Sequence, residues 1–110
     1  MSKMKDNEVL SEIFYVDRSI VHGRGLYAKV GISKGEYMGT YDGPSAKRNG
    51  MHVLWVENDD GEWCGINGKN ILRFLNHSKN PHAEFDGCDL YALREITPGV
   101  EITIDYGDDY

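Results

Sequence analysis

Cysteine is scarce in this chain of 110 residues, which has two cysteines and no C-x-x-C pair. Cys64 and Cys88 lie far apart, so they predict neither a zinc site nor a disulfide framework. No hydrophobic run approaches membrane-spanning length, and the N-terminus MSKMKDNEVLSEIF lacks the apolar core of a signal peptide. We therefore expect no membrane partner and an intracellular, reducing location, cytoplasmic or, in a eukaryotic host, nuclear.

Basic residues are also in the minority. Twelve lysines and arginines stand against 18 acidic residues, which gives a formal net charge of −6. A nucleic-acid-binding domain usually presents a basic face, so we expect no direct binding to nucleic acid. An acidic surface suits a basic partner, although many proteins are acidic for solubility alone.

The length and the glycine distribution predict a single domain that is mainly β. A chain of 110 residues supports one modest core. Thirteen glycines divide it into strand-like runs: EIFYVDRSIV, GEYMGTYDG, MHVLWVE, LYALREI and VEITIDYG. Asp-Gly in VENDDGEW predicts a hairpin, and Pro-Gly in ITPGVE predicts a type II turn. The helical candidate is GKNILRFLNH, and residues 1–8 are expected to be flexible ahead of a domain at residues 9–110.

The first candidate site is HGRGLYA, in which Gly23, Gly25 and Ala28 satisfy the spacing G-x-G-x-x-A. A dinucleotide-binding turn opens a helix, whereas the glycines of the following KVGISKGEY cut any helix short. We therefore reject a nucleotide-binding fold. Two interpretations stay open for this stretch: a glycine pair that lets a ligand approach the backbone, and an ordinary β-turn.

The second candidate site is RFLNHSKNPHAEF, where Asn76, His77 and Ser78 follow an apolar pair. Each unpaired polar group costs free energy when it is desolvated, so a buried strand has little use for such a triplet. Asn76-His77-Ser78 also matches the glycosylation signal N-x-S, which means little without a secretion signal. Ser78 lacks the sequence context of a catalytic serine. His77 and His82 would need a third ligand to suggest a zinc site. Asn and neutral His both donate and accept hydrogen bonds, which suits a ligand with an amine and a heterocycle.

The third candidate site is GVEITIDYGDDY, where Tyr106 and Tyr110 lie among the acidic residues Glu101, Asp105, Asp108 and Asp109. One interpretation is a terminal strand with a solvated acidic tail. The other is a tyrosine hydroxyl beside a glycine turn that orients or polarises a reacting group.

Taken together and in this order, these stretches closely resemble the SET-domain family of protein lysine methyltransferases. GRGLY matches the opening G-x-G with an aromatic, and SKGEYMGTYDG matches K-G-E…Y-x-G with Tyr41 at the tyrosine. NILRFLNHSKNP matches N-x-x-R-F-x-N-H-S-x-x-P, and GVEITIDYG matches G-x-E-(I/L)-x-x-D-Y-G. The resemblance spans about residues 14–110, and the four motifs occur in the family's order, which makes it specific. It implies a mainly β fold of small curved sheets, with a knot-like C-terminal crossing under the Asn-His-Ser loop.

The resemblance implies S-adenosylmethionine as cofactor, S-adenosylhomocysteine as product, and no metal. Asn76 and His77 would hold the adenine and amino-acid portions, Ser78 would support the loop, and the backbone from Gly23 onward would wrap the cofactor. Arg73 would brace the loop or meet the cofactor carboxylate, or would simply be solvated. The implied cofactor-binding residues are Arg24, Gly25, Leu26, Tyr27, Arg73, Asn76 and His77.

The implied reaction transfers a methyl group to a neutral lysine amine of a basic protein, such as a histone-like tail. A free lysine of pKa about 10.4 needs roughly 4.6 kcal/mol to become neutral at pH 7. A dry aromatic channel lowers that cost and aligns the displacement. Tyr106 matches the family's catalytic tyrosine. The candidate channel residues are Tyr41, Val53, Trp55, Ile104 and Tyr110, although Tyr41 and Trp55 fit equally well as core aromatics.

The chain also departs from the family pattern. Lys79 stands where many members carry a zinc-ligating cysteine, and no cysteine cluster follows Tyr110, so one channel wall is not accounted for. Tyr110 or a second subunit would complete it, which makes a homodimer a hypothesis. Val53 and Ile104 stand where channel aromatics are common, which leaves the degree of methylation open. The alternative functions are a cofactor- or peptide-binding module with weak or no methyl transfer, and a scaffold without a ligand.

Overall fold

The structure is a computed structural model, and it describes residues 7–21, 23–48, 50, 52–57 and 60–105. Its helical elements are the α-helix α1 (Asn7–Ile13) and the 3-10 helix η1 (Ile71–Phe74). All other regular elements are short strands: β1 (Phe14–Arg18), β2 (Arg24–Ala28), β3 (Tyr37–Thr40), β4 (Ser45–Ala46), β5 (Val53–Glu57), β6 (Trp63–Asn67), β7 (Asn76–His77), β8 (Ala83–Asp86), β9 (Asp89–Ala92) and β10 (Glu101–Ile104). The mainly β prediction is confirmed.

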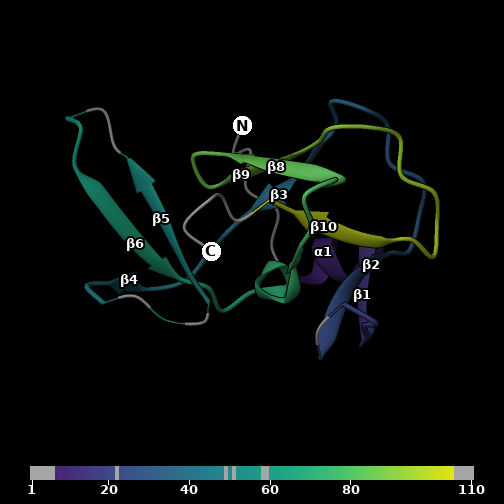
Figure 1. Ribbon diagram of the computed structural model, residues 1–110, viewed down its shortest axis with the longest axis horizontal. Helices are drawn as coiled ribbons and strands as arrows, with labels where there is room; N and C mark the ends of the chain where they lie inside the picture. Colours follow the sequence, from purple (N-terminus) through teal and green to yellow (C-terminus); the bar gives the residue numbers. More distant parts are fainter. Residues whose placement is uncertain (1–6, 22, 49, 51, 58–59, 106–110) are drawn as a thin grey trace.

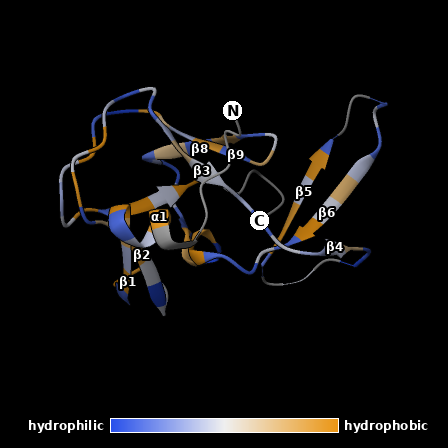
Figure 2. Ribbon diagram, turned by 180° about the vertical axis from the view of Figure 1, so that it is seen from behind, coloured by the Kyte–Doolittle hydropathy of each residue, from blue (hydrophilic) through white to orange (hydrophobic). Residues whose placement is uncertain are grey.

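The strands form three small sheets. A 4-stranded sheet has the order β1-β2-β10-β7, and two 3-stranded sheets have the orders β3-β9-β8 and β4-β6-β5. The hairpin of β5 and β6 stands apart from the other two sheets, as both views of the ribbon show (Figures 1 and 2). No helix in the described part of the chain has the length and apolar character needed to cross a bilayer.

Two turn predictions are confirmed. β5 and β6 form an antiparallel hairpin in which Glu57 pairs with Trp63. In the Pro-Gly turn, Val100 N donates to Thr97 O at 3.3 Å, and Gly99 has a φ of 88°. That positive φ at the third position is the mark of a type II turn. The hairpin of β8 and β9, in which Asp86 pairs with Asp89, was not predicted.

Two predicted elements, one strand and one helix, need correction. The expected strand over residues 12–21 begins only at Phe14, because Asn7–Ile13 forms α1. Packing explains this short helix, since Leu10 is fully buried in the core. The expected helix GKNILRFLNH is reduced to η1, because Leu75 is already extended and Asn76–His77 forms β7.

The hydrophobic core lies around β10, which runs between β2 and β7. Ile102 is fully buried, and Thr103 and Ile104 are also buried, so both faces of this strand are covered. The largest fully buried side chains are Phe14, Leu10, Leu26, Met38, Leu72, Leu90, Ile96 and Ile102. This central position of β10 brings β2 and β7 to its two sides, and those two strands carry the predicted cofactor-binding motifs.

Candidate functional site

The two predicted cofactor-binding segments meet across β10. Ile102 pairs with Leu26 of β2 in antiparallel register, and Thr103 pairs with Asn76 of β7 in parallel register. The side-chain amide Nδ2 of Asn76 donates a hydrogen bond of 2.9 Å to the backbone oxygen of Arg24. The fold thus joins two segments that are 52 residues apart in the chain.

A half-buried carboxylate lies at this junction. Asn76 Nδ2 also donates to Glu101 Oε2 at 3.0 Å. The Ser19 hydroxyl approaches both carboxylate oxygens, at 2.8 Å from Oε1 and 2.7 Å from Oε2. Glu101 is therefore a partner in a polar cluster at the start of the terminal strand, while Asp108 and Asp109 of the expected acidic tail lie outside the described residues. A charged residue at the start of an otherwise apolar buried strand was the available signal, since a desolvated charge needs partners.

The two glycines of the G-x-G motif have different roles. Gly23 has a φ of 47°, and a Cβ built there would meet nothing within 4 Å. A Cβ on Gly25 would lie only 2.2 Å from Glu101 Oε2. Gly23 thus provides a left-handed turn beside open space, whereas Gly25 makes room for the Glu101 carboxylate.

The remaining residues of β2 differ in how accessible they are. The Arg24 side chain is exposed, whereas Leu26 is fully buried and belongs to the core. Tyr27 stacks on Tyr15 with ring centroids 5.4 Å apart, and its hydroxyl donates to Arg18 O. Desolvation, and then the negative charge of Glu101, raise the pKa of the Tyr27 phenol. A ligand at β2 would therefore meet the Gly23–Arg24 end of the strand.

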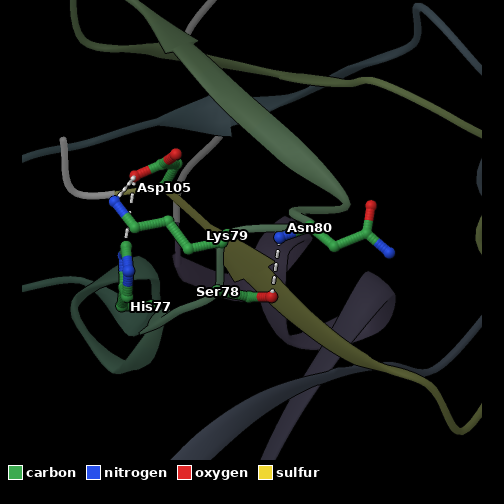
Figure 3. A network of polar contacts seen from close by, with 5 residues as sticks. All are labelled: His77, Ser78, Lys79, Asn80 and Asp105. Carbon is green, nitrogen blue, oxygen red and sulfur yellow. Dashed lines mark hydrogen bonds and ion pairs between the residues drawn. The ribbon is translucent and has the colours of Figure 1, made fainter. Parts of the chain in front are cut away.

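The loop after β7 is linked to the end of β10 (Figure 3). His77 Nδ1 and Lys79 Nζ both point toward Asp105 Oδ1, at 3.7 Å and 3.8 Å. Ser78 N donates to Ile104 O at 2.9 Å, and Ser78 Oγ accepts from Asn80 N at 3.0 Å. Both contacts with Asp105 are long and partly exposed, which makes them weak, so the shorter hydrogen bonds hold this loop more firmly.

Arg94, which sequence reasoning did not single out, holds the same loop from the end of β9. Its Nη2 donates to the backbone oxygens of Asn80 at 2.7 Å and Pro81 at 2.8 Å, and to Asn80 Oδ1 at 3.0 Å. The neighbouring His82 N donates to Thr103 O at 3.0 Å. Because most of these acceptors are backbone oxygens, no residue pattern in the sequence indicates them.

Arg73 braces the segment before the loop. Its Nη1 donates to the backbone oxygens of Lys69 at 2.8 Å and Asn70 at 3.0 Å, and its guanidinium lies 4.4 Å from the centre of the Phe74 ring. These contacts agree with the bracing role, while a contact with the cofactor carboxylate stays a prediction. Within the described ranges, Asn70 Oδ1 is the one buried side-chain polar atom without a hydrogen-bond partner.

The predicted channel residues belong to different parts of the fold. Tyr41 is buried, its hydroxyl donates to His52 O, and its ring packs edge-on against Phe85 at 5.6 Å, as a core aromatic does. Val53 and Trp55 lie on β5 of the β4-β6-β5 sheet, whereas Ile104 lies on β10 of the four-stranded sheet, and Figure 1 shows these two strands apart. Tyr106 and Tyr110 lie outside the described residues. The channel thus stays a prediction. Over the described ranges, no three His, Cys, Asp or Glu side chains form a group that would hold a metal.

The comparisons with known proteins identify the family. The sequence model of the SET-domain family matches residues 23–107, so the chain belongs to this family. Among curated relatives, Histone-lysine N-methyltransferase set-1 of Caenorhabditis elegans is 29% identical over 93% of this chain, and Histone-lysine N-methyltransferase 2B of Homo sapiens is 31% identical over 83%. The chain spans 52% of the first relative and 4% of the second.

Two solved structures share the fold. The methyltransferase domain of human PR domain-containing protein 2 has a TM-score of 0.70, 22% identity, and coverage of 90% of this chain and 80% of that chain. The methyltransferase domain of human Histone-lysine N-methyltransferase SETMAR has a TM-score of 0.73, 23% identity, and coverage of 84% and 44%. The SET fold predicted from the four motifs is confirmed.

Proposed function

We propose that this SET domain transfers a methyl group from S-adenosylmethionine to the side-chain amine of lysine in a basic protein. The observation that carries the proposal is the hydrogen bond from Asn76 to Arg24, which joins the two motifs that the family resemblance assigns to the cofactor. The names of the curated relatives, which are histone-lysine N-methyltransferases, support the reaction and the substrate class.

The residues around this junction fit the proposed cofactor. Gly23 turns the backbone beside open space, so a ligand can approach the chain closely there. The exposed guanidinium of Arg24 suits the carboxylate of the methionine portion. His77, with a 14% exposed side chain, and the backbone of β7 would hold the adenosine. When bound, the cofactor supplies an electrophilic methyl group on a sulfonium.

The proposed catalytic group is the Tyr106 hydroxyl. Tyr106 directly follows Asp105, whose carboxylate faces His77 across the parallel pair of β7 and β10. This adjacency along the chain supports a tyrosine near the cofactor strand β7. Its hydroxyl would orient the lysine amine and the methyl group for an in-line displacement, while a dry channel favours the neutral amine.

The net charge of −6 supports a basic substrate, because opposite charge speeds encounter more than it strengthens binding. An intracellular location, nuclear in a eukaryotic host, goes with a histone-like target. A homodimer remains part of the proposal.

The test is transfer from labelled S-adenosylmethionine to a mixed pool of basic proteins, with Tyr106→Phe compared with wild type. We expect transfer by wild type and a loss of at least about a hundredfold in the variant, as for other oriented hydroxyl or amide groups. Tyr91→Phe on β9 is the matched control. Cofactor binding without transfer would support the binding module instead, and the absence of both would support a scaffold.

A further inference from the structure

We propose that Glu101 is a positioning residue that aligns the two halves of the cofactor site, and that position 25 is glycine to admit its carboxylate. This inference rests on the proposed function, because the site that it orders is the one assigned to S-adenosylmethionine. It concerns a residue that contacts neither the cofactor nor the substrate in the proposal and acts through Asn76.

The carboxylate of Glu101 lies where three other elements converge. Ser19 follows β1, Gly25 belongs to β2, and Asn76 belongs to β7, while Glu101 itself begins β10. Ser19 Oγ lies 2.7 Å and Asn76 Nδ2 lies 3.0 Å from Glu101 Oε2. Ser19 Oγ in turn accepts from Val21 N at 2.9 Å, which continues the cluster into the turn before Gly23. One carboxylate thus connects both cofactor-binding segments.

Glu101 also determines how the Asn76 side chain is oriented. Asn76 Nδ2 faces two oxygens, Arg24 O at 2.9 Å and Glu101 Oε2 at 3.0 Å. An ionised carboxylate and a carbonyl can only accept hydrogen bonds, so the amide nitrogen must occupy this position. A flipped amide would place its oxygen against both acceptors. The carboxylate, together with Arg24 O, therefore fixes which way the Asn76 side-chain oxygen faces.

Gly25 is needed because the carboxylate packs directly on the β2 backbone. A Cβ at this position would lie 2.2 Å from Glu101 Oε2 and 2.8 Å from its Cδ. An alanine there would push the carboxylate away from Ser19 and Asn76. The second glycine of the G-x-G motif is thus explained by a contact within the protein, whereas Gly23 is the glycine beside open space.

The test measures the affinity for S-adenosylhomocysteine by titration calorimetry, well below the unfolding temperature of each variant. Glu101→Ala is expected to weaken binding by at least about tenfold, because charge-assisted hydrogen bonds are lost, and Gly25→Ala to act in the same direction. Glu101→Gln is expected to stay within about threefold of wild type, because its oxygen accepts from Asn76 and its amide donates to Ser19. Glu84→Ala on β8, an exposed carboxylate, is the control.

A second pair of variants keeps the test decisive if Glu101→Ala does not fold. Asn76→Asp places a carboxylate against Glu101 and should weaken binding. Adding Glu101→Gln restores a donor toward residue 76, and part of the affinity should return. Wild-type binding that Glu101→Ala and Gly25→Ala leave unchanged, or a double variant no better than Asn76→Asp, would overturn this inference alone. Absence of binding by wild type would overturn the proposed function and this inference with it.

Discussion

At the scale of single residues, close backbone contacts explain some of the glycines of this chain. A Cβ on Gly43 would lie 1.9 Å from the backbone oxygen of Asn67, and backbone cannot move aside as a flexible side chain can. A Cβ on Gly31 would meet nothing within 4 Å. The same substitution to alanine should therefore cost much more stability at Gly43 than at Gly31.

We predict that Gly43→Ala lowers the free energy of unfolding by roughly 2 kcal/mol or more, as overpacking against fixed atoms does. Gly31→Ala should change it by less than about 0.5 kcal/mol or raise it slightly, because the unfolded chain loses freedom. Urea denaturation of both variants measures the difference. Equal stabilities of the two variants would contradict the contact between Gly43 and Asn67.

His82 provides a pH-dependent prediction. Burial, and then the charge of Arg94, lower its pKa from the ordinary value, with Glu101 acting in the opposite direction. The unfolded state then binds a proton more readily, so the stability from neutral His82 is present above about pH 6.5 and is lost as pH falls toward the lowered folded pKa. The thermal unfolding temperature of wild type should therefore fall more than that of His82→Asn between about pH 7 and pH 5. Parallel curves would contradict the shift.

The motif residues of the site were predictable from sequence, whereas their partners were not. Asn76, His77 and the G-x-G pair are residue types whose spacing matches a known pattern. Glu101 and Ser19 are 82 positions apart, and Arg94 binds mostly backbone oxygens. A short window of sequence therefore predicts neither the Ser19–Glu101 hydrogen bonds nor the contacts of Arg94. The structure was needed to show that Gly23 and Gly25 serve different purposes.

At the scale of elements, the short strands follow from runs of β-branched and aromatic residues, but α1 does not follow from local preference. A helix of 7 residues is marginal on its own, and packing stabilises it through Leu10, which is 0% exposed. Propensity over so short a window carries little information, and the adjoining EIFYVDRSIV favours a strand.

We therefore predict that Leu10→Ala lowers the free energy of unfolding by about 2–5 kcal/mol, because it leaves a cavity in the core. Glu12→Ala on the exposed side of the same helix should cost less than about 0.5 kcal/mol. Denaturant unfolding followed by circular dichroism measures both variants. A Leu10→Ala variant as stable as wild type would mean that α1 does not belong to the core.

The loop after β7 depends on Arg94 more than on Lys79. Arg94 donates to three acceptors within 3.0 Å, whereas the Lys79–Asp105 pair is 3.8 Å long and the Lys79 side chain is 66% exposed. Arg94→Ala should cost about 1–3 kcal/mol of stability, and Lys79→Ala less than about 0.5 kcal/mol. Thermal and urea unfolding of both variants measure the two losses of stability. A larger loss from Lys79→Ala would contradict this ranking.

At the scale of the whole molecule, the four motifs predicted the SET fold, but the arrangement of its three sheets needed the structure. β10 comes last among the strands and yet lies between β2 and β7. Such non-local pairing depends on the packing of Ile102 and its neighbours against the core, which no short window of sequence shows. Residues 106–110 lie outside the described residues, so the knot-like crossing of the C-terminal segment stays a prediction.

The homodimer hypothesis also belongs to this scale, because it concerns the assembly of whole chains. Light scattering at the concentration used for methyl transfer should give the mass of two chains. A fully active species with the mass of one chain, 12.4 kDa, would contradict the hypothesis.

The central claim is that the ends of β2 and β7 form one cofactor site. The most direct test is a titration of the isotopically labelled protein with S-adenosylhomocysteine, followed by backbone amide chemical shifts in NMR. The account predicts that the largest changes occur at residues 23–25 and 76–78, with little change on the hairpin of β5 and β6. Saturable changes centred on β8 and β9 instead, or no changes at all, would contradict it.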